Sequence, residues 1–173
     1  TWVFGFRNSP TVTYSKFIPP LDYDEGLVSY VGGLFWDGRV DSLAEQAEKP
    51  FLNPLEMHNY NKWLVVQSLI KAGHGPAFRR VYGARSLDLK TDAQANAAFA
   101  NIADAIAAYE QSAELNRFSS KFDNHLKGRV KLTAQEALGL ELFNGKGRCA
   151  FCHPSTAQNG QPGPLFTNFS YHN

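Results

Sequence analysis

The sequence predicts an all-α protein with long loops, on three observations. Apolar residues recur three and four positions apart over 92–115, the spacing of one buried helical face. Thr91 with Gln94, and Thr133 with Glu136, match the capping box that opens a helix. Alternation of apolar and polar residues, the mark of a half-buried strand, is almost absent.

The first 40 residues are predicted to be loops, because prolines and glycines interrupt any longer element there. A short helix is expected next, over 42–49. Asp41 is its predicted N-cap, and Pro50 is expected to end it.

A second helix is predicted to begin at Asn59 or Asn61 and to run to about Ala72, where Gly73 stops it. Its expected apolar stripe consists of Trp63, Val66 and Ile70.

Three helical segments are predicted further along the chain. Residues 76–82 form a short helical turn that ends at Gly83, 92–115 form a long helix, and a last helix ends at Phe143. The buried face of the long helix is predicted to be Ala95, Phe99, Ile102, Ile106, Tyr109 and Ala113. Leu138, Leu142 and Phe143 are predicted to point inward from the last helix.

Both cysteines of the chain fall in one CxxCH stretch, Cys149, Cys152 and His153. This spacing suits covalent attachment of haem c, with a thioether from each sulfur and His153 as the proximal iron ligand. A thioredoxin-like CxxC needs a βαβ setting, whereas the flanks here are predicted to be helical. A structural zinc site needs four ligands, and the chain has no second cysteine pair.

Composition sets broad limits on the class of protein. The 173 residues are 43% hydrophobic, with a formal net charge of +1, which gives no indication of a nucleic-acid partner. No apolar run approaches the roughly 20 residues that span a membrane, and the first residues lack the features of a signal peptide. Haem c is attached outside the bacterial inner membrane, so we expect an exported, periplasmic protein.

Three further stretches are too specific for structure alone: LFWDGR (34–39), SLAEQA (42–47) and NPLEM (53–57). Together with the CxxCH stretch they resemble the bacterial di-haem cytochrome c peroxidases and the related MauG-type enzymes. The resemblance extends in colinear order over nearly the whole chain, and Trp36, Gln46 and Glu56 keep the family's spacing of ten residues.

The resemblance implies a fold of cytochrome c-like haem domains and two haems per polypeptide. Residues 1–128 would be the remainder of the N-terminal, peroxide-binding domain, and 129–173 the start of the C-terminal, electron-transfer domain. The family's first CxxCH would precede Arg7, so the chain is expected to be an internal portion of a longer enzyme.

The resemblance also assigns roles to four residues. Glu56 is similar to the distal acid–base catalyst, Gln46 to the polar group that holds water or peroxide, and Trp36 to the indole between the two haems. Asn8 resembles a ligand of a calcium ion. The structural alternative for Glu56 and Gln46 is a solvated surface position, for Trp36 a core position, and for Asn8 a turn.

The activity implied is reduction of hydrogen peroxide to water with electrons from a small cytochrome c or a cupredoxin. One alternative is the MauG-type reaction, in which peroxide drives oxidation of a protein or organic substrate. Another is a mono-haem electron-transfer subunit without catalysis. Similar enzymes often form homodimers.

Overall fold

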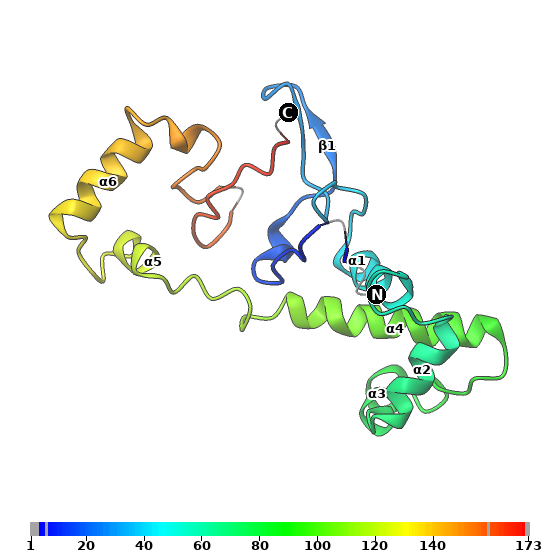
Figure 1. Cartoon of the computed structure of the whole chain (residues 1–173). Helices are drawn as coiled ribbons and strands as arrows, with labels where there is room; N and C mark the ends of the chain where they lie inside the picture. Colours follow the sequence, from blue (N-terminus) through cyan, green and yellow to red (C-terminus); the bar gives the residue numbers. More distant parts are fainter. Residues whose placement is uncertain (1–3, 6, 159, 172–173) are drawn as a thin grey trace.

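The computed structural model describes residues 4–5, 7–158 and 160–171, and it is mostly helical, as predicted (Figure 1). The helices are α1 (Leu43–Leu52), α2 (Lys62–Lys71), α3 (Gly75–Tyr82), α4 (Asp92–Glu110), α5 (Lys121–Leu126) and α6 (Ala134–Asn144). Two 3-10 turns, Ser15–Phe17 and Cys149–Phe151, and a short hairpin of β1 (Asp22–Asp24) and β2 (Ser29–Val31) complete it. None of the helices described is long and apolar enough to cross a bilayer.

Helix α4 is the centre of the larger helical group, because α1 and α2 both pack against it (Figure 1). Phe99 of α4 is 1% exposed and meets Phe51 edge to face, with 5.7 Å between ring centroids. The core around it consists of Val65, Val66, Phe78, Leu87, Ala98, Phe99 and Ile102. The capping box of Thr91 and Gln94 is present, as predicted.

The first helix differs from its prediction at both ends. Its N-cap is Ser42, whose hydroxyl accepts from the Glu45 amide at 3.2 Å, whereas the Asp41 carboxylate accepts from the Leu21 amide at 2.8 Å. Pro50 lies inside α1 instead of ending it. Because Pro50 is in the last turn, its missing N–H removes only the helical bond to the Gln46 carbonyl.

The predicted apolar faces of two helices were partly wrong. On α2 the buried residues are Val65 and Val66, while Ile70 is exposed and half-buried Trp63 donates to Asp92. Helix α4 ends at Glu110, and Tyr109 and Ala113 are exposed. The side-chain amide of Asn116 donates to the carbonyls of Glu110 and Ser112, which closes the helix early.

Helices α5 and α6 form a smaller group, joined to the first by an extended segment (Figure 1). Helix α5 was not predicted, although Ser120 and Asp123 form its capping box. The predicted box of Thr133 and Glu136 is present in α6. The Lys121 ammonium group donates to Glu136 Oε2 at 2.6 Å. This bond, together with the hydrogen bonds between Glu136 and Thr133, lowers the pKa of Glu136 to about 2.

Two leucines of α6 do not point inward as predicted. Leu138 is 55% exposed and Leu142 48% exposed, while Phe143 is half-buried against Phe166. The main neighbour of α6 is the 149–151 turn, so most of the helix surface faces outward.

The end of the described chain returns to the hairpin near the start. The Gly32 amide donates to the Phe169 carbonyl, and the Tyr171 amide donates to the Tyr30 carbonyl, both at 2.9 Å. Val31 and Ser170 form an antiparallel bridge. Residues about 140 positions apart are thereby held together by backbone bonds.

The core packing predicts the effect of truncating Phe99. Phe99→Ala should lower the free energy of unfolding by about 3–5 kcal/mol, because it removes buried apolar area and leaves a cavity. Val81→Ala on α3, where Val81 is 73% exposed, should change it by less than about 0.5 kcal/mol. Urea unfolding followed by far-UV circular dichroism measures both, and equal effects would contradict the packing described.

Candidate active site

A cavity of about 580 Å³ lies where α1, the 53–57 turn, the end of α4 and the 35–39 loop meet residues 7–12. Three predicted catalytic residues, Trp36, Gln46 and Glu56, line it together with Asn8. The lining also contains residues that had no predicted role, among them Arg7, Phe35, Arg39 and Glu110.

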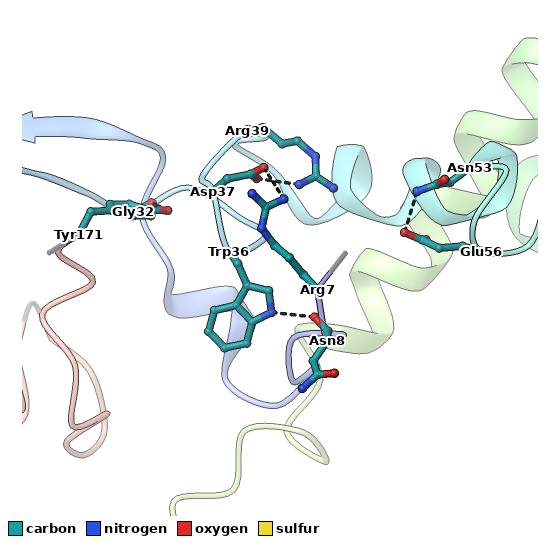
Figure 2. A network of polar contacts seen from close by, with 9 residues as sticks. All are labelled: Arg7, Asn8, Gly32, Trp36, Asp37, Arg39, Asn53, Glu56 and Tyr171. Atoms are coloured by element: carbon teal, nitrogen blue, oxygen red, sulfur yellow. Dashed lines mark hydrogen bonds and ion pairs between the residues drawn. The ribbon is translucent and has the colours of Figure 1, made fainter. Parts of the chain in front are cut away.

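Glu56 is positioned by a turn built on Asn53. The Asn53 side-chain amide donates to Glu56 Oε1 at 2.8 Å, and its Oδ1 accepts from the Leu55 amide at 3.0 Å (Figure 2). The Asn53 carbonyl accepts from the amides of Glu56 and His58. The Asn-Pro turn signal at 53–54 was visible in the sequence, but its role in orienting Glu56 was not.

Gln46 is half-buried on α1 and lines the cavity together with Pro50. Since Pro50 has no N–H to offer the Gln46 carbonyl, that carbonyl is released from the helical ladder. Gln46 thus contributes to the cavity lining from a helix whose hydrogen-bond ladder is interrupted at Pro50.

Trp36 stands on a tight loop closed by the bridge between Leu34 and Val40, each 3% exposed. A Cβ on Gly33 would meet the backbone of Gly38 at 2.6 Å, and both glycines have positive φ, so the loop needs glycine at these positions. The Trp36 indole N–H donates to the Asn8 carbonyl at 2.7 Å, although the side chain is 60% exposed (Figure 2).

Two arginines at the cavity converge on Asp37 (Figure 2). Arg39 Nη1 lies 2.7 Å and Arg7 Nη1 3.2 Å from its carboxylate oxygens. Burial alone would raise the pKa of Asp37, but the hydrogen bond and charge of Arg39 and the charge of Arg7 outweigh it and lower that pKa. The Arg39 guanidinium also stacks on Phe35, 3.8 Å from the ring centroid.

A second cavity, of about 540 Å³, adjoins the first and shares Pro10, Thr11, Phe35, Trp36 and Gln46 with it. Its other walls come from the N-terminal 3-10 turn, Phe118 and the 164–169 segment. Trp36 therefore belongs to the wall of both cavities.

The CxxCH stretch forms a 3-10 turn, in which residues i and i+3 lie on the same side. Cys149 is exposed, Cys152 is half-buried, and both are free thiols. His153 Nδ1 lies 2.8 Å from the Phe166 carbonyl. A carbonyl only accepts, so Nδ1 carries the proton and Nε2 has a free lone pair for a metal.

These features fit haem c, because two thiols share one side and a hydrogen-bonded imidazole presents an unprotonated nitrogen. The sequence offered no sign of Phe166 as partner, since that contact depends on the loop that returns 13 residues later. Among the described residues no group of three or more His, Cys, Asp or Glu side chains could hold a metal ion, which leaves the zinc alternative without further ligands there.

Residues 1–131 match the family model described as di-haem cytochrome c peroxidase. The chain is 36% identical over 170 residues to the methylamine utilization protein MauG of Paracoccus denitrificans, covering 98% of this chain and 42% of that one. It is 38% identical over 165 residues to cytochrome c551 peroxidase of Pseudomonas aeruginosa, covering 92% and 40%.

The fold is similar to the crystal structure of the diheme peroxidase BthA from Burkholderia thailandensis E264. The TM-score is 0.78 at 32% identity, over 97% of this chain and 40% of that one. The chain thus spans about two fifths of the length of these relatives.

Substitutions in the CxxCH stretch test whether haem is attached there. Replacing both cysteines, Cys149→Ala with Cys152→Ala, should lower the covalent haem count of the full-length protein by one, because no sulfur is left to form a thioether. Intact mass and the alkaline pyridine spectrum measure that count. Phe151→Ala, at a 74% exposed position of the same turn, is the matched control and should keep the haem. An unchanged count in the double variant would exclude attachment here.

Proposed function

The chain belongs to the di-haem cytochrome c peroxidase family, and on that premise we propose that the whole protein reduces hydrogen peroxide to water in the periplasm. The observation that carries the proposal is the cavity in which Gln46 and an Asn53-oriented Glu56 lie together. Its volume, about 580 Å³, is in the ordinary range for a cofactor or ligand site.

The reaction requires two electrons and two protons for each peroxide, H₂O₂ + 2e⁻ + 2H⁺ → 2H₂O. Haem, when bound, supplies the iron that holds peroxide and the electrons that reduce it. Glu56 takes the proton from one peroxide oxygen and gives it to the other, so that the leaving oxygen departs as water. Asn53 keeps the Glu56 carboxyl aimed for this transfer, because its amide holds Oε1 at 2.8 Å.

Gln46 is proposed to orient the substrate. Its side-chain amide has both donor and acceptor groups, as water and peroxide do. Its place on α1 also gives it more rigid support than a loop residue has. A fixed partner for peroxide keeps the reacting oxygens within reach of Glu56.

Trp36 is proposed as the electron relay between the two cavities, since it belongs to the wall of both. Cys149, Cys152 and His153 would hold the electron-transfer haem, and a second haem c is proposed for the full-length protein. Electrons would come from a small cytochrome c or a cupredoxin. A division into 1–128 and 129–173 is supported by the end of the family match at residue 131.

We further propose Asn8 as a calcium ligand and a homodimer as the assembly, both from family resemblance. The Asn8 side chain is exposed, which leaves its amide oxygen available to calcium, a cation that prefers oxygen ligands. The Asn8 carbonyl already accepts from Trp36.

A second candidate function is the MauG-type oxidation of a protein or organic substrate. It is favoured by the 36% identity to MauG over 98% of this chain. Turnover of peroxide with a reduced small cytochrome c as donor supports the peroxidase. Peroxide consumption that requires an oxidisable protein or organic substrate supports the alternative. A single covalent haem in the full-length protein would instead favour a mono-haem electron-transfer subunit.

Glu56→Gln tests the acid–base role. We expect peroxide turnover to fall about 10²–10⁴-fold, because the amide cannot accept and return the proton. The reducible haem spectrum should be unchanged. Glu45→Gln, an exposed position on α1, should keep wild-type turnover. Near wild-type turnover in Glu56→Gln would remove Glu56 from the mechanism.

A further inference from the structure

A second carboxyl group, that of Glu110, lines the cavity that holds Glu56. Glu110 is the last residue of α4, and its side chain forms no ion pair within the part of the chain described. Its Oε2 is buried and without a hydrogen-bond partner there. A buried carboxylate without a partner is costly, whereas a protonated acid can use the same oxygen as a donor.

The surroundings of Glu110 favour the protonated form. Burial raises the pKa of Glu110; a hydrogen bond donated by the Ser15 hydroxyl would oppose that rise. The Ser15 hydroxyl, however, donates its proton to the Val12 carbonyl at 3.0 Å. The Ser15 oxygen is then left to accept, so a hydrogen bond between Ser15 and Glu110 needs the proton on Glu110.

Two more unpartnered polar atoms lie buried just beyond Glu110. They are Ser112 Oγ and Asn116 Oδ1, and Asn116 is 9% exposed. The Asn116 amide holds the carbonyls of Glu110 and Ser112 at 2.8 and 2.7 Å, so the three residues form one cluster.

The charged groups nearby do not neutralise Glu110. Arg7 and Arg39 line the same cavity but are paired with Asp37. Lys16, on the N-terminal 3-10 turn, donates to the Gln111 carbonyl at 3.3 Å. Glu56, the remaining charged residue of the lining, is itself a carboxyl group.

We propose that Glu110 is a neutral carboxylic acid that donates a proton into the cavity during peroxide reduction. The proposal rests on the function proposed above. Glu56 only moves a proton from one peroxide oxygen to the other, whereas the balanced reaction consumes two protons from outside the peroxide. Among the described lining residues, Glu110 is the other carboxyl group able to supply one.

The proton balance of this step is simple. The O–H bond of Glu110 breaks, and the proton passes through cavity water to the second peroxide oxygen, which needs this proton and one more from solvent to become water. The electrons come from the external small redox protein. Glu110, now a carboxylate in a poorly solvated position, regains a proton from solvent.

The protonation state is tested by infrared spectroscopy on the full-length, haem-loaded protein at neutral pH. The wild type should show the carbonyl stretch of a protonated carboxylic acid, shifted in D₂O, and Glu110→Gln should lose that band. Glu114→Gln, an exposed glutamate just beyond α4, is the matched control and should keep it. Identical spectra for wild type and Glu110→Gln would overturn the proposal.

Thermal stability against pH gives an independent readout of the same state. The folded pKa of Glu110 lies above its ordinary value of 4.5, so the wild type loses stability as pH rises from 4.5 towards the folded pKa. Glu110→Gln has no such proton to lose. The melting temperature of this variant should therefore rise relative to wild type across that window. A difference that does not change with pH would overturn the protonated state.

Peroxide turnover tests the donor role. Glu110→Gln should lower kcat by about 10²-fold and increase the solvent deuterium isotope effect, because the amide keeps the shape but delivers no proton. Glu114→Gln should match wild type. A normal kcat in Glu110→Gln would overturn the donor role. If the wild type itself reduces no peroxide, the proposed function fails and the donor role fails with it, while the infrared band still decides the protonation state.

Discussion

The arrangement of the site depends on the return of residues 168–171 to the hairpin. The Asn168 amide donates to the Cys152 carbonyl at 3.1 Å, and the Phe169 carbonyl accepts from Gly32 at 2.9 Å. From Gly32 the chain runs directly into the loop of Trp36, and the Tyr171 hydroxyl donates to the Gly32 carbonyl (Figure 2). Backbone hydrogen bonds, rather than helix packing, thus set the position of the CxxCH turn relative to Trp36. They also pair the outer edge of β2, which would otherwise be open to another chain.

The candidate site residues stand mostly on short loops, and each loop is fixed by its own polar contacts. Asn53 orients Glu56 within one turn, and Asp37 pairs with Arg39 of its own loop and with Arg7 of the N-terminal segment. Helix α4 supports the Asn53 turn, because α1, which leads directly into that turn, packs against α4. Loops carried by a rigid helix combine precise placement with access to solvent, which suits a site that admits a small polar substrate.

Prediction from the sequence was most successful where the pattern lay within a few neighbouring residues. The capping boxes at Thr91 and Thr133 were found because all their atoms lie within four residues. The grouping of Trp36, Gln46 and Glu56 was implied by the family resemblance of the short motifs that contain them. The end of α4 was missed because it depends on the folded-back side chain of Asn116. The partner of His153 was missed because Phe166 reaches it only after a loop has closed.

Two carboxyl groups in one cavity have different surroundings. Glu56 is exposed and accepts from a neutral amide, while the Glu110 carboxyl is partly buried beside the Ser15 hydroxyl and carries an unpartnered oxygen. When two titratable groups share a site but differ in environment, the environments separate the tasks of acid and base. A solvated carboxyl can take up and return a proton quickly, whereas a desolvated one keeps its proton until a stronger base forms nearby. The proposed peroxide reduction requires both, since one proton is moved between the oxygens and others must be supplied. The end of α4 is therefore as much a part of the site as the NPLEM turn that faces it.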